Sequence, residues 1–493
     1  MVLDLMGQLD RELTERHKIE GLLRELLDAR KARKSERISD EQMALFEAAW
    51  KARCPEPEPA EEAPAEEAGP EQEQEQKKRG GRQPLARNLK RERIVHDLAE
   101  QDKHCAGCHT DLRLIGEETS ERYEYIPASL KVVEDACLTY ACECTVRTAG
   151  KPPQPIEKGT AGASLLAQVI VAKLEDHLPL NRQEKIFERH GAEISRKTMG
   201  GWMAQSAGLL GPLYNTAKVV LLESNTIKTD DTGVKVLDRK LDFARTGRMW
   251  PYLGDREHPV VVFDYTPTRE RAGPEKFLEG YRGHLHADAY PGYDAFFTNP
   301  DRGMTEVGCW MHARRYFHRA LESDPGRMGP ALYLIGQLYR FEDQAKPLSA
   351  QDRVAVRQRL SRPTMDKLRG YLLEIQQQVL PKSPAAAAAR YTLNNWTALN
   401  RYLDDGELDI DNGATERVIR DIAVGRNNWT FFGSDNGGRT AAVLRTFVSS
   451  CKRVGVEPFA WFSDVLSRVA SHPVSRLAEL LPHNWAPAQA QVQ

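Results

Sequence analysis

Residues 225–237, with the sequence NTIKTDDTGVKVL, are the stretch from which the fold is best predicted. β-Branched residues recur along it, as is typical of a strand, and an acidic pair, Asp230 and Asp231, lies within it. Metal-dependent phosphodiester chemistry uses two hard cations that carboxylate oxygens hold roughly 3.5–4 Å apart. We therefore ask whether other acids can reach Asp230. The alternative is that the pair simply forms a turn.

The segments around this stretch predict an α/β sheet with a helical insertion. Short runs rich in β-branched and aromatic residues predict further strands at 249–253, 260–265, 284–289 and 307–310. Helical periodicity then dominates from about 314 to 400, with apolar stripes at 332–341, 354–360, 368–380 and 385–403. A turn at 410–413 could cap a helix that begins near Ala414.

Two further acids stand where this sheet could bring them to Asp230. Asp288 ends the predicted strand at 284–289, and Glu416 lies at the start of the helix near Ala414. Acids at the edge of a sheet can meet a helix packed beside that edge. Each also has an ordinary alternative. Asp288 could cap the Pro-Gly turn that follows it, and Glu416 could pair with Arg420, which stabilises a helix by ~0.3–0.5 kcal/mol.

Composition and charge favour a polyanionic partner. The chain has 493 residues, which suggests roughly three or more units. Residues 54–76 contain nine glutamates among Pro, Ala and Gln, so they predict a disordered acidic linker. The whole chain has a formal charge of −2, and without those glutamates it would be +7. With no apolar run of 18 residues and no signal pattern, we expect a soluble cytoplasmic protein with no membrane contact.

The N-terminal segments offer two candidate interaction elements. Apolar residues at alternating spacings of three and four predict an amphipathic helix within residues 2–50, which could form a short coiled coil or pack on its own domain. After the acidic linker the charge reverses. The basic arm that follows could contact a DNA backbone or be a solvated tether, and its candidate DNA-binding residues are Lys77, Lys78, Arg79 and Arg82.

Cysteine spacing predicts a structural zinc site. Cys105 and Cys108 form a CxxC pair, and Cys142 and Cys144 form a tighter CxC pair. Two such pairs around a hairpin can give four thiolates to one tetrahedral Zn²⁺, as in a zinc ribbon. Substitute ligands are available nearby in Cys137, His104 and His109, and incidental cysteines are the alternative.

Residues 160–222 are predicted to be helical, with Ser195 as an N-cap.

Several long motifs occur in a fixed order along the chain. They are residues 229–232 (TDDT), 285–293 (LHADAYPGY), 309–315 (CWMHARR), 411–417 (DNGATER), 425–429 (GRNNW) and 432–434 (FGS). With residues 33–37 (RKSER) and 177–183 (HLPLNRQ), they resemble the IS66 family of bacterial insertion-sequence transposases over nearly the whole chain. The resemblance implies a multidomain α/β protein whose ribonuclease-H-like catalytic core carries a helical insertion.

The resemblance also implies the chemistry and the partners. Asp230, Asp288 and Glu416 would be a DDE triad that holds two Mg²⁺ (or Mn²⁺) ions, with Asp231 in a supporting role. The partners would be double-stranded DNA, as terminal inverted repeats and as target, a second copy in a homodimer or larger assembly, and small accessory proteins of the element. A catalytically silent repressor derived from a transposase and a metal-dependent nuclease are the alternatives.

Basic and aromatic residues follow the third acid. Guanidinium groups beside aromatic rings can hold phosphates and stack on an unpaired base, which makes candidates of Arg417, Arg420, Arg426 and Trp429, with Arg439 and Arg445 nearby. A buried aromatic cluster with solvated arginines is the alternative. For His312 we predict a structural hydrogen bond.

The chain departs from the family pattern at a few positions, and a domain map follows from the segments. Gly233 replaces a common proline, Gly413 a second asparagine and Asn427 a lysine, while the second cysteine pair is CxC.

The expected map is an N-terminal helix (1–50), a linker and arm (51–80), a zinc-binding DNA-binding module (81–150), a helical domain (160–222), the catalytic core (223–450, insertion about 318–400) and a helical tail (451–493).

Overall fold

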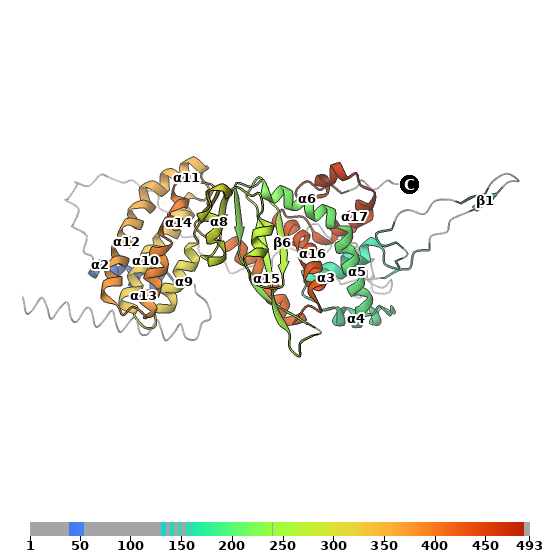
Figure 1. Ribbon diagram of the computed structural model, residues 1–493, viewed down its shortest axis with the longest axis horizontal. Helices are drawn as coiled ribbons and strands as arrows, with labels where there is room; N and C mark the ends of the chain where they lie inside the picture. The colour runs from blue at the N-terminus through green and yellow to red at the C-terminus, as the bar shows by residue number, and fades with distance from the viewer. Residues whose placement is uncertain are drawn as a thin grey trace, which may run out of the picture. The chain divides into compact units, whose positions relative to one another are not determined.

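The computed structural model describes residues 39–53, 130–134, 139–141, 146–148, 154–157, 159–238 and 240–487. Contacts divide the chain into two units, one formed by Met1–Pro57 with Asp135–Gln493 and the other by Glu58–Glu134. All the helices and strands named below belong to the first unit. Figure 1 labels many of them and colours them by their position along the chain. They include a small antiparallel hairpin of β1 (Thr139–Ala141) and β2 (Val146–Thr148).

A mixed six-stranded sheet forms the centre of this unit. Its strands are β3 (Thr226–Thr229), β4 (Thr232–Val236), β5 (Arg245–Leu253), β6 (Val261–Thr266), β7 (Gly283–His286) and β8 (Met304–Val307). Strand β5 pairs antiparallel with β6 on one side and with both β3 and β4 on the other. Strand β3 pairs parallel with β7, and β7 pairs parallel with β8.

Strands β3 and β4 are two halves of one line that the acidic pair interrupts. Lys228 pairs with Leu253 and Thr232 pairs with Met249, so the register runs on unchanged across the break. In this register Asp230 falls opposite Pro251, which has no N–H to offer to a ladder. The first candidate acid therefore sits in the middle of the sheet, between two paired segments.

Helices cover both faces of the sheet. One group is α3 (Ala163–Leu174), α4 (Leu180–Arg189), α5 (Arg196–Leu209), α6 (Gly211–Leu222), α16 (Asp435–Arg453) and α17 (Pro458–Arg468). Most of these helices share one apolar core with β5, β6 and β7. A second core lies between the β4–β6 face and α15 (Gly413–Trp429) together with α16. Short helices α7 (Ala272–Phe277) and α8 (Asp294–Thr298) precede and follow β7 along the chain.

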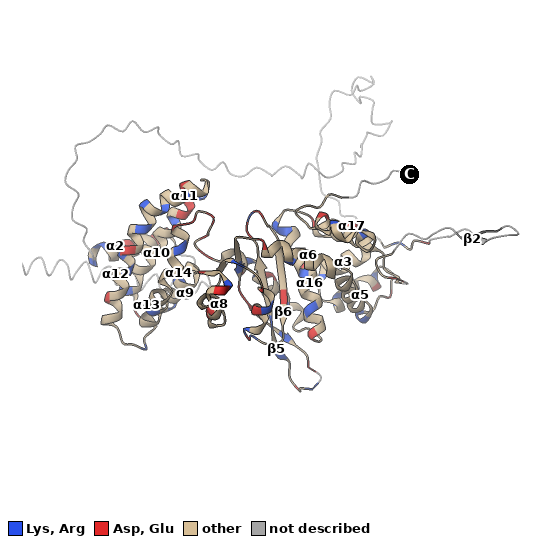
Figure 2. Cartoon of the chain, turned by 45° about the horizontal axis from the view of Figure 1, so that its top comes forward, with Lys and Arg blue, Asp and Glu red and all other residues tan. Residues whose placement is uncertain are grey.

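A helical insertion with its own core separates β8 from α15. It contains α9 (Trp310–Ala320), α10 (Pro325–Ala345), α11 (Ala350–Val356), a π-helical turn (Arg357–Ser361), α12 (Arg362–Gln378), α13 (Pro384–Asn394) and α14 (Trp396–Asn400). Val307 of β8 belongs to this core, so the insertion packs at the β8 edge of the sheet. Charges of both signs are spread over these helices instead of gathering on one of them (Figure 2).

The N-terminal helix that the structure describes, α2 (Asp40–Arg53), packs on this insertion. Met43, Phe46 and Trp50 are buried against it. Trp50 meets Tyr371 of α12 edge-on, with 5.5 Å between ring centroids. This part of the N-terminal region therefore packs on its own chain. The predicted coiled-coil seam at residues 5–26 lies outside the described residues.

Most predicted elements are present, and one strand was misplaced. The strand predicted at 307–310 is wrong in position, because β8 is Met304–Val307 and Trp310 begins α9. The apolar run Val-Gly-Cys-Trp suits a strand end as well as the start of a buried helix, so periodicity could not separate the two. Ser195 caps α5 as predicted, since its hydroxyl accepts a hydrogen bond from the Thr198 N–H. No helix in the described part of the chain is long and apolar enough to cross a membrane.

Candidate active site

The two adjacent aspartates point to opposite faces of the sheet. Alternate residues of a strand share a face, so Asp230 has the orientation of Val234, whose face is covered by α15. Asp231 points to the other face, where its side chain is only 2% exposed. There it pairs with Arg248 at 2.8 Å and with Arg269 at 2.7 Å. Asp231 is therefore held by two arginines, and its supporting role stays a prediction.

Asp288 follows the parallel neighbour of the strand that carries Asp230. Strand β7 ends at His286, which pairs in register with Lys228, so Asp288 comes two residues beyond the paired region. Arg269 lies 3.9 Å from Asp288 and stacks over the Tyr290 ring at 4.3 Å. Arg269 therefore links Asp231 to Asp288. Its signal in the sequence was weak, because it stands in a polar loop outside every motif.

Glu416 lies in the first turn of α15, and a buried asparagine fixes where that helix begins. The Asn412 side-chain amide donates to the carbonyl oxygen of Thr229 at 2.8 Å. Its carbonyl oxygen accepts from the Thr415 hydroxyl at 2.5 Å, and its backbone N–H donates to Cys309 Sγ at 3.2 Å. These bonds attach the start of α15 to the end of β3, immediately before Asp230.

The charges of the other acids act on Asp230. Burial, followed by the negative charge of Asp288, raises the pKa of Asp230 to about 7, and the charges of Asp231 and Glu416 add to the rise. Burial also raises the pKa of Asp288, against the opposing effects of His312 and Arg269. Like charges gathered in a partly buried place are unfavourable unless cations neutralise them.

Glu416 has a cation partner within the chain. Arg315 of α9 donates from Nη2 to both carboxylate oxygens of Glu416, at 3.0 and 3.2 Å. His312, one turn earlier on α9, has its Nε2 3.7 Å from the same carboxylate. Glu416 thus pairs with Arg315 instead of the predicted alternative Arg420.

His312 does not make the structural hydrogen bond that we predicted. Its Nδ1 is buried and has no hydrogen-bond partner among the described residues. Burial lowers the pKa of His312, and the negative charges of Asp288 and Glu416 oppose that effect. The prediction failed because the packing of α9 against α15, which sequence spacing does not reveal, brings this imidazole to the acids.

The donor set suits a hard divalent cation, but the acids do not yet form a closed ligand group. Asp230, Asp288 and Glu416 offer only carboxylate oxygens, the ligands that Mg²⁺ and Mn²⁺ prefer. Within the part of the chain that the structure describes, no three His, Cys, Asp or Glu side chains are grouped tightly enough to hold one ion. The carboxylate of Glu416 is directed to Arg315 instead.

The predicted DNA-binding residues on α15 have different surroundings. Arg417 and Arg420 are exposed on the helix that carries Glu416. Arg426 donates to the Gly233 carbonyl oxygen at 2.9 Å, so it attaches α15 to β4. Trp429 is half-buried and stacks on Phe432, with 4.7 Å between ring centroids.

Arg445, the most distal of the basic residues, is not available to a phosphate. It is 3% exposed and donates hydrogen bonds to Asp421 and to the carbonyl oxygen of Leu174. It is therefore a structural residue that joins α16 to α3 and α15. Periodicity did not distinguish it from exposed arginines, because charged residues on a helix are usually at the surface.

Other predicted site residues lie outside the described part of the chain. They are the zinc candidates Cys105, Cys108, Cys142 and Cys144, and the basic-arm residues Lys77, Lys78, Arg79 and Arg82.

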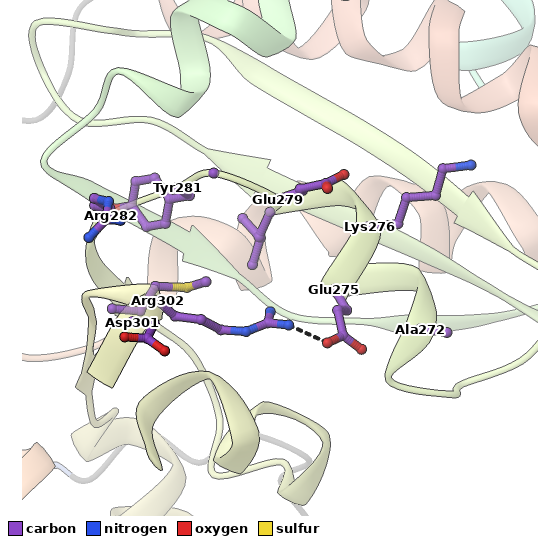
Figure 3. A pocket seen from close by; sticks show the side chains of 11 residues that line it. Ala272, Glu275, Lys276, Glu279, Tyr281, Arg282, Asp301 and Arg302 are labelled. Carbon is purple, nitrogen blue, oxygen red and sulfur yellow. Dashed lines mark hydrogen bonds and ion pairs between the residues drawn. The ribbon is translucent and has the colours of Figure 1, made fainter. Parts of the chain in front are cut away.

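A separate pocket of about 460 Å³ lies near the opposite ends of β7 and β8 from the acids (Figure 3). The Arg302–Glu275 ion pair lies along its wall. Its charged lining is balanced, with three basic and three acidic residues: Lys276, Arg282, Arg302, Glu275, Glu279 and Asp301. A balanced lining does not favour a polyanion, so this pocket adds nothing to the acid site.

Comparison with known proteins covers most of the chain. Residues 158–440 match the Transposase IS66 family, and 446–483 match the IS66 C-terminal element. Residues 102–145 match the zinc-finger binding domain of transposase IS66, and 18–94 match Transposase C of IS166 homeodomain.

Two similar relatives come from Sinorhizobium fredii and carry the names uncharacterized protein y4hP and uncharacterized protein y4jD. Protein y4hP is 31% identical over 437 residues, which cover 84% of this chain and 78% of the relative. Protein y4jD is 32% identical over 430 residues, which cover 82% of this chain and 83% of the relative.

Proposed function

Since the chain belongs to the IS66 family of transposases, we propose that it is a DDE transposase that binds the terminal inverted repeats of an insertion sequence. It cleaves DNA strands at those ends and joins them to target DNA. The family and the zinc-finger match make DNA its partner. The observation that carries the proposal is geometric: the Asn412–Thr229 hydrogen bond attaches the start of the Glu416 helix to the residue before Asp230, and β7, which leads to Asp288, pairs parallel with β3.

The strand arrangement supports a ribonuclease-H-like core. Three antiparallel strands, β6, β5 and the β3–β4 line, continue into the parallel strands β7 and β8. The first acid lies on the central line, the second follows the neighbouring parallel strand, and the third comes on a helix after the insertion. This arrangement lets acids that are far apart in the sequence face one volume.

The three carboxylates would hold the divalent cations. Two Mg²⁺ or Mn²⁺ ions so held would supply the chemistry of lowering the pKa of a water or DNA 3′-hydroxyl and stabilising the charge on the phosphate. The protein's own contribution is to position the acids through Asn412 and to hold Asp231 away on the opposite face. Exposed Arg417 and Arg420 on the same helix as Glu416 suit contacts to phosphate oxygens.

The zinc-finger match supports a structural zinc ion, which we assign to Cys105, Cys108, Cys142 and Cys144. Metal analysis of the purified chain tests this assignment. We expect one zinc per chain, and loss of that zinc with reduced binding to inverted-repeat DNA in Cys105→Ser. A full complement of zinc in that variant would remove Cys105 from the ligand set.

A strand-transfer assay tests the function. A labelled duplex carrying the element's end is incubated with target DNA and Mg²⁺, using the wild-type chain, Asp288→Asn and the control Asp301→Asn, whose acid is exposed outside the site. Joined products should form with the wild type and the control but not with Asp288→Asn. Equal joining by Asp288→Asn would reject the triad. Cleavage without joining would favour a nuclease, and binding without cleavage a repressor.

Assembly is the remaining part of the proposal. Two element ends must be brought together for strand transfer, so we expect a homodimer or a larger assembly on DNA, with small accessory proteins of the element taking part. Light scattering of the chain with and without end-bearing duplex tests this. A single chain bound to each pair of ends would contradict it.

A further inference from the structure

Arg315 forms an ion pair with Glu416, the third acid of the proposed triad. Its Nη2 contacts both oxygens of Glu416, at 3.0 and 3.2 Å, and the two side chains are about equally shielded, with 26% and 28% exposure. A carboxylate that gives both oxygens to a guanidinium has fewer lone pairs free for a metal ion. Among the described residues, Glu416 so paired is not grouped with other acids tightly enough to hold one ion.

The pairing follows from how the two helices are joined at their starts. The Trp310 N–H donates to the Ile410 carbonyl oxygen at 3.2 Å, and the Asn412 N–H donates to Cys309 Sγ at 3.2 Å. The Trp310 ring is fully buried, and its Nε1–H donates to the Leu399 carbonyl oxygen at 3.0 Å. Helices α9 and α15 therefore begin side by side at fixed positions.

The same helix face carries a second nitrogen base toward the acid. His312 and Arg315 are three residues apart, so they share one face of α9. His312 is 3.7 Å from Glu416, beyond a normal hydrogen bond, whereas Arg315 is within one. Arg315 is permanently charged at any physiological pH. It is therefore the group that neutralises Glu416 in the metal-free protein.

We propose that Arg315 is a positioning residue that holds Glu416 in the metal-free protein, and that divalent-cation binding requires Glu416 to exchange Arg315 for the metal. The inference rests on the proposed function, because it takes the three acids as the metal site. It goes beyond that function in assigning Arg315 a competitive role. Arg315 weakens metal binding. The three acids form a complete metal site only when Glu416 binds the cation more strongly than it binds the Arg315 guanidinium.

Mn²⁺ binding to the full-length chain without DNA tests this directly. Free Mn²⁺ is counted by electron paramagnetic resonance for the wild type, Arg315→Gln, Arg315→Lys and the control Arg319→Gln. Arg319 is exposed on the same helix, so its variant makes the same change in net charge away from Glu416. Thermal unfolding of each variant verifies that the variant is folded. If Arg315→Gln does not fold, Arg315→Lys provides a milder change at the same position.

We expect Arg315→Gln to bind Mn²⁺ roughly fivefold more tightly, which corresponds to the loss of one partly exposed ion pair. Arg315→Lys should fall between it and the wild type, because lysine keeps the positive charge but has a different length and only a compact ammonium to reach the Glu416 carboxylate. Arg319→Gln should match the wild type. A structural role alone would not tighten metal binding, so this readout separates the two.

Two results would overturn the inference. One is unchanged or weaker Mn²⁺ binding by Arg315→Gln, and the other is an equal gain in Arg319→Gln. A parallel measurement on Asp288→Asn separates failure of the inference from failure of the site. If Asp288→Asn loses Mn²⁺ while Arg315→Gln gains none, the site stands and the role of Arg315 falls. If Asp288→Asn binds Mn²⁺ as the wild type does, the proposed metal site itself is wrong.

Discussion

The side-chain amide of Asn412 donates a 2.8 Å hydrogen bond to the backbone carbonyl oxygen of Thr229, the residue before Asp230. The two residues are 183 positions apart, and both are fully buried. Asn412 stands at the N-cap position of α15, so this bond attaches the start of the helix that carries Glu416 to the residue before Asp230.

Asn412→Ala should therefore destabilise the chain and disorganise the site together. The variant leaves the Thr229 carbonyl oxygen buried without its partner, which costs about 1–3 kcal/mol in the free energy of unfolding. Chemical denaturation measures the loss. The control Asn427→Ala changes an exposed asparagine of the same helix and should stay within about 0.5 kcal/mol of the wild type. Equal stability of the two variants would show that the Asn412–Thr229 hydrogen bond does not contribute to the free energy of unfolding.

The raised pKa of Asp230 predicts how metal-free stability depends on pH. Its folded-state pKa of about 7 lies above the ordinary aspartate value. The folded state therefore holds a proton more tightly than the unfolded state. The contribution to stability is fully present below about pH 4 and is lost as pH rises through about 7. In EDTA, the wild type should lose stability relative to Asp230→Asn over this window.

Denaturation curves at several pH values between 4 and 8 test that prediction. Asp301→Asn is the control, because its exposed carboxylate should leave the wild-type pH profile unchanged. Adding Mg²⁺ should restore stability to the wild type mainly at the upper end of the range, where Asp230 is ionised and can accept the cation. Parallel pH profiles for the wild type and Asp230→Asn would contradict the raised pKa.

The positions of most strands along the chain could be predicted from the sequence because strands leave local signals, whereas the assignment of the three acids stays a prediction. Alternation around Asp230 and the apolar run before Asp288 mark the strands, and β3, β4, β5, β6 and β7 lie where these patterns placed them. The helix start near Ala414 was predicted from the turn residues at 410–413. The long motifs favoured Asp230 over Asp231, a choice that spacing alone left open and that stays a prediction.

The contacts between distant helices could not be predicted in this way. Arg315 stands in one of the motifs, yet nothing local indicates that it faces Glu416, 101 residues later. The burial of Arg445 was missed for the same reason. Both depend on which helix faces meet after the insertion has folded, and periodicity gives a face without giving its neighbour. Arg269 was missed because no pattern marks it at all.

Arg357 should be the least replaceable residue of the insertion. It is 1% exposed, pairs with Glu342 through two hydrogen bonds of 2.8 and 2.6 Å, and donates to the carbonyl oxygens of Tyr402, Asp405 and Leu408. These carbonyls belong to the segment that leads to Asn412. Arg357→Met would leave Glu342 as an unpaired, largely buried charge, at a cost of about 3–5 kcal/mol.

Thermal and chemical unfolding measure this loss. Arg359→Met is the matched control, because Arg359 is exposed only two residues away. Its stability should change by no more than about 0.5 kcal/mol. A small effect of Arg357→Met would mean that the apolar core of the insertion, and not this hydrogen-bonded arginine, holds the 402–408 segment.

Trp50→Ala should release α2 from the insertion while the rest of the unit stays folded. Trp50 is 7% exposed and meets Tyr371 at 5.5 Å, and the Arg53 guanidinium lies 5.4 Å from the same ring. Removing the indole costs about 3–5 kcal/mol of contacts. The loss should fall mainly on α2, because the insertion helices contribute most of the buried residues of the core that α2 joins.

Hydrogen exchange resolved to peptides tests this local effect. Amides of residues 43–53 should lose roughly a hundredfold of protection, since about 3 kcal/mol of docking energy converts to that factor in the open population. Peptides from α15 and the sheet should be unchanged. Lys51→Ala, on the exposed side of α2, should keep protection near the wild-type level. If Trp50→Ala instead lowers protection throughout the insertion, α2 is an integral part of that core and not a separately docked helix.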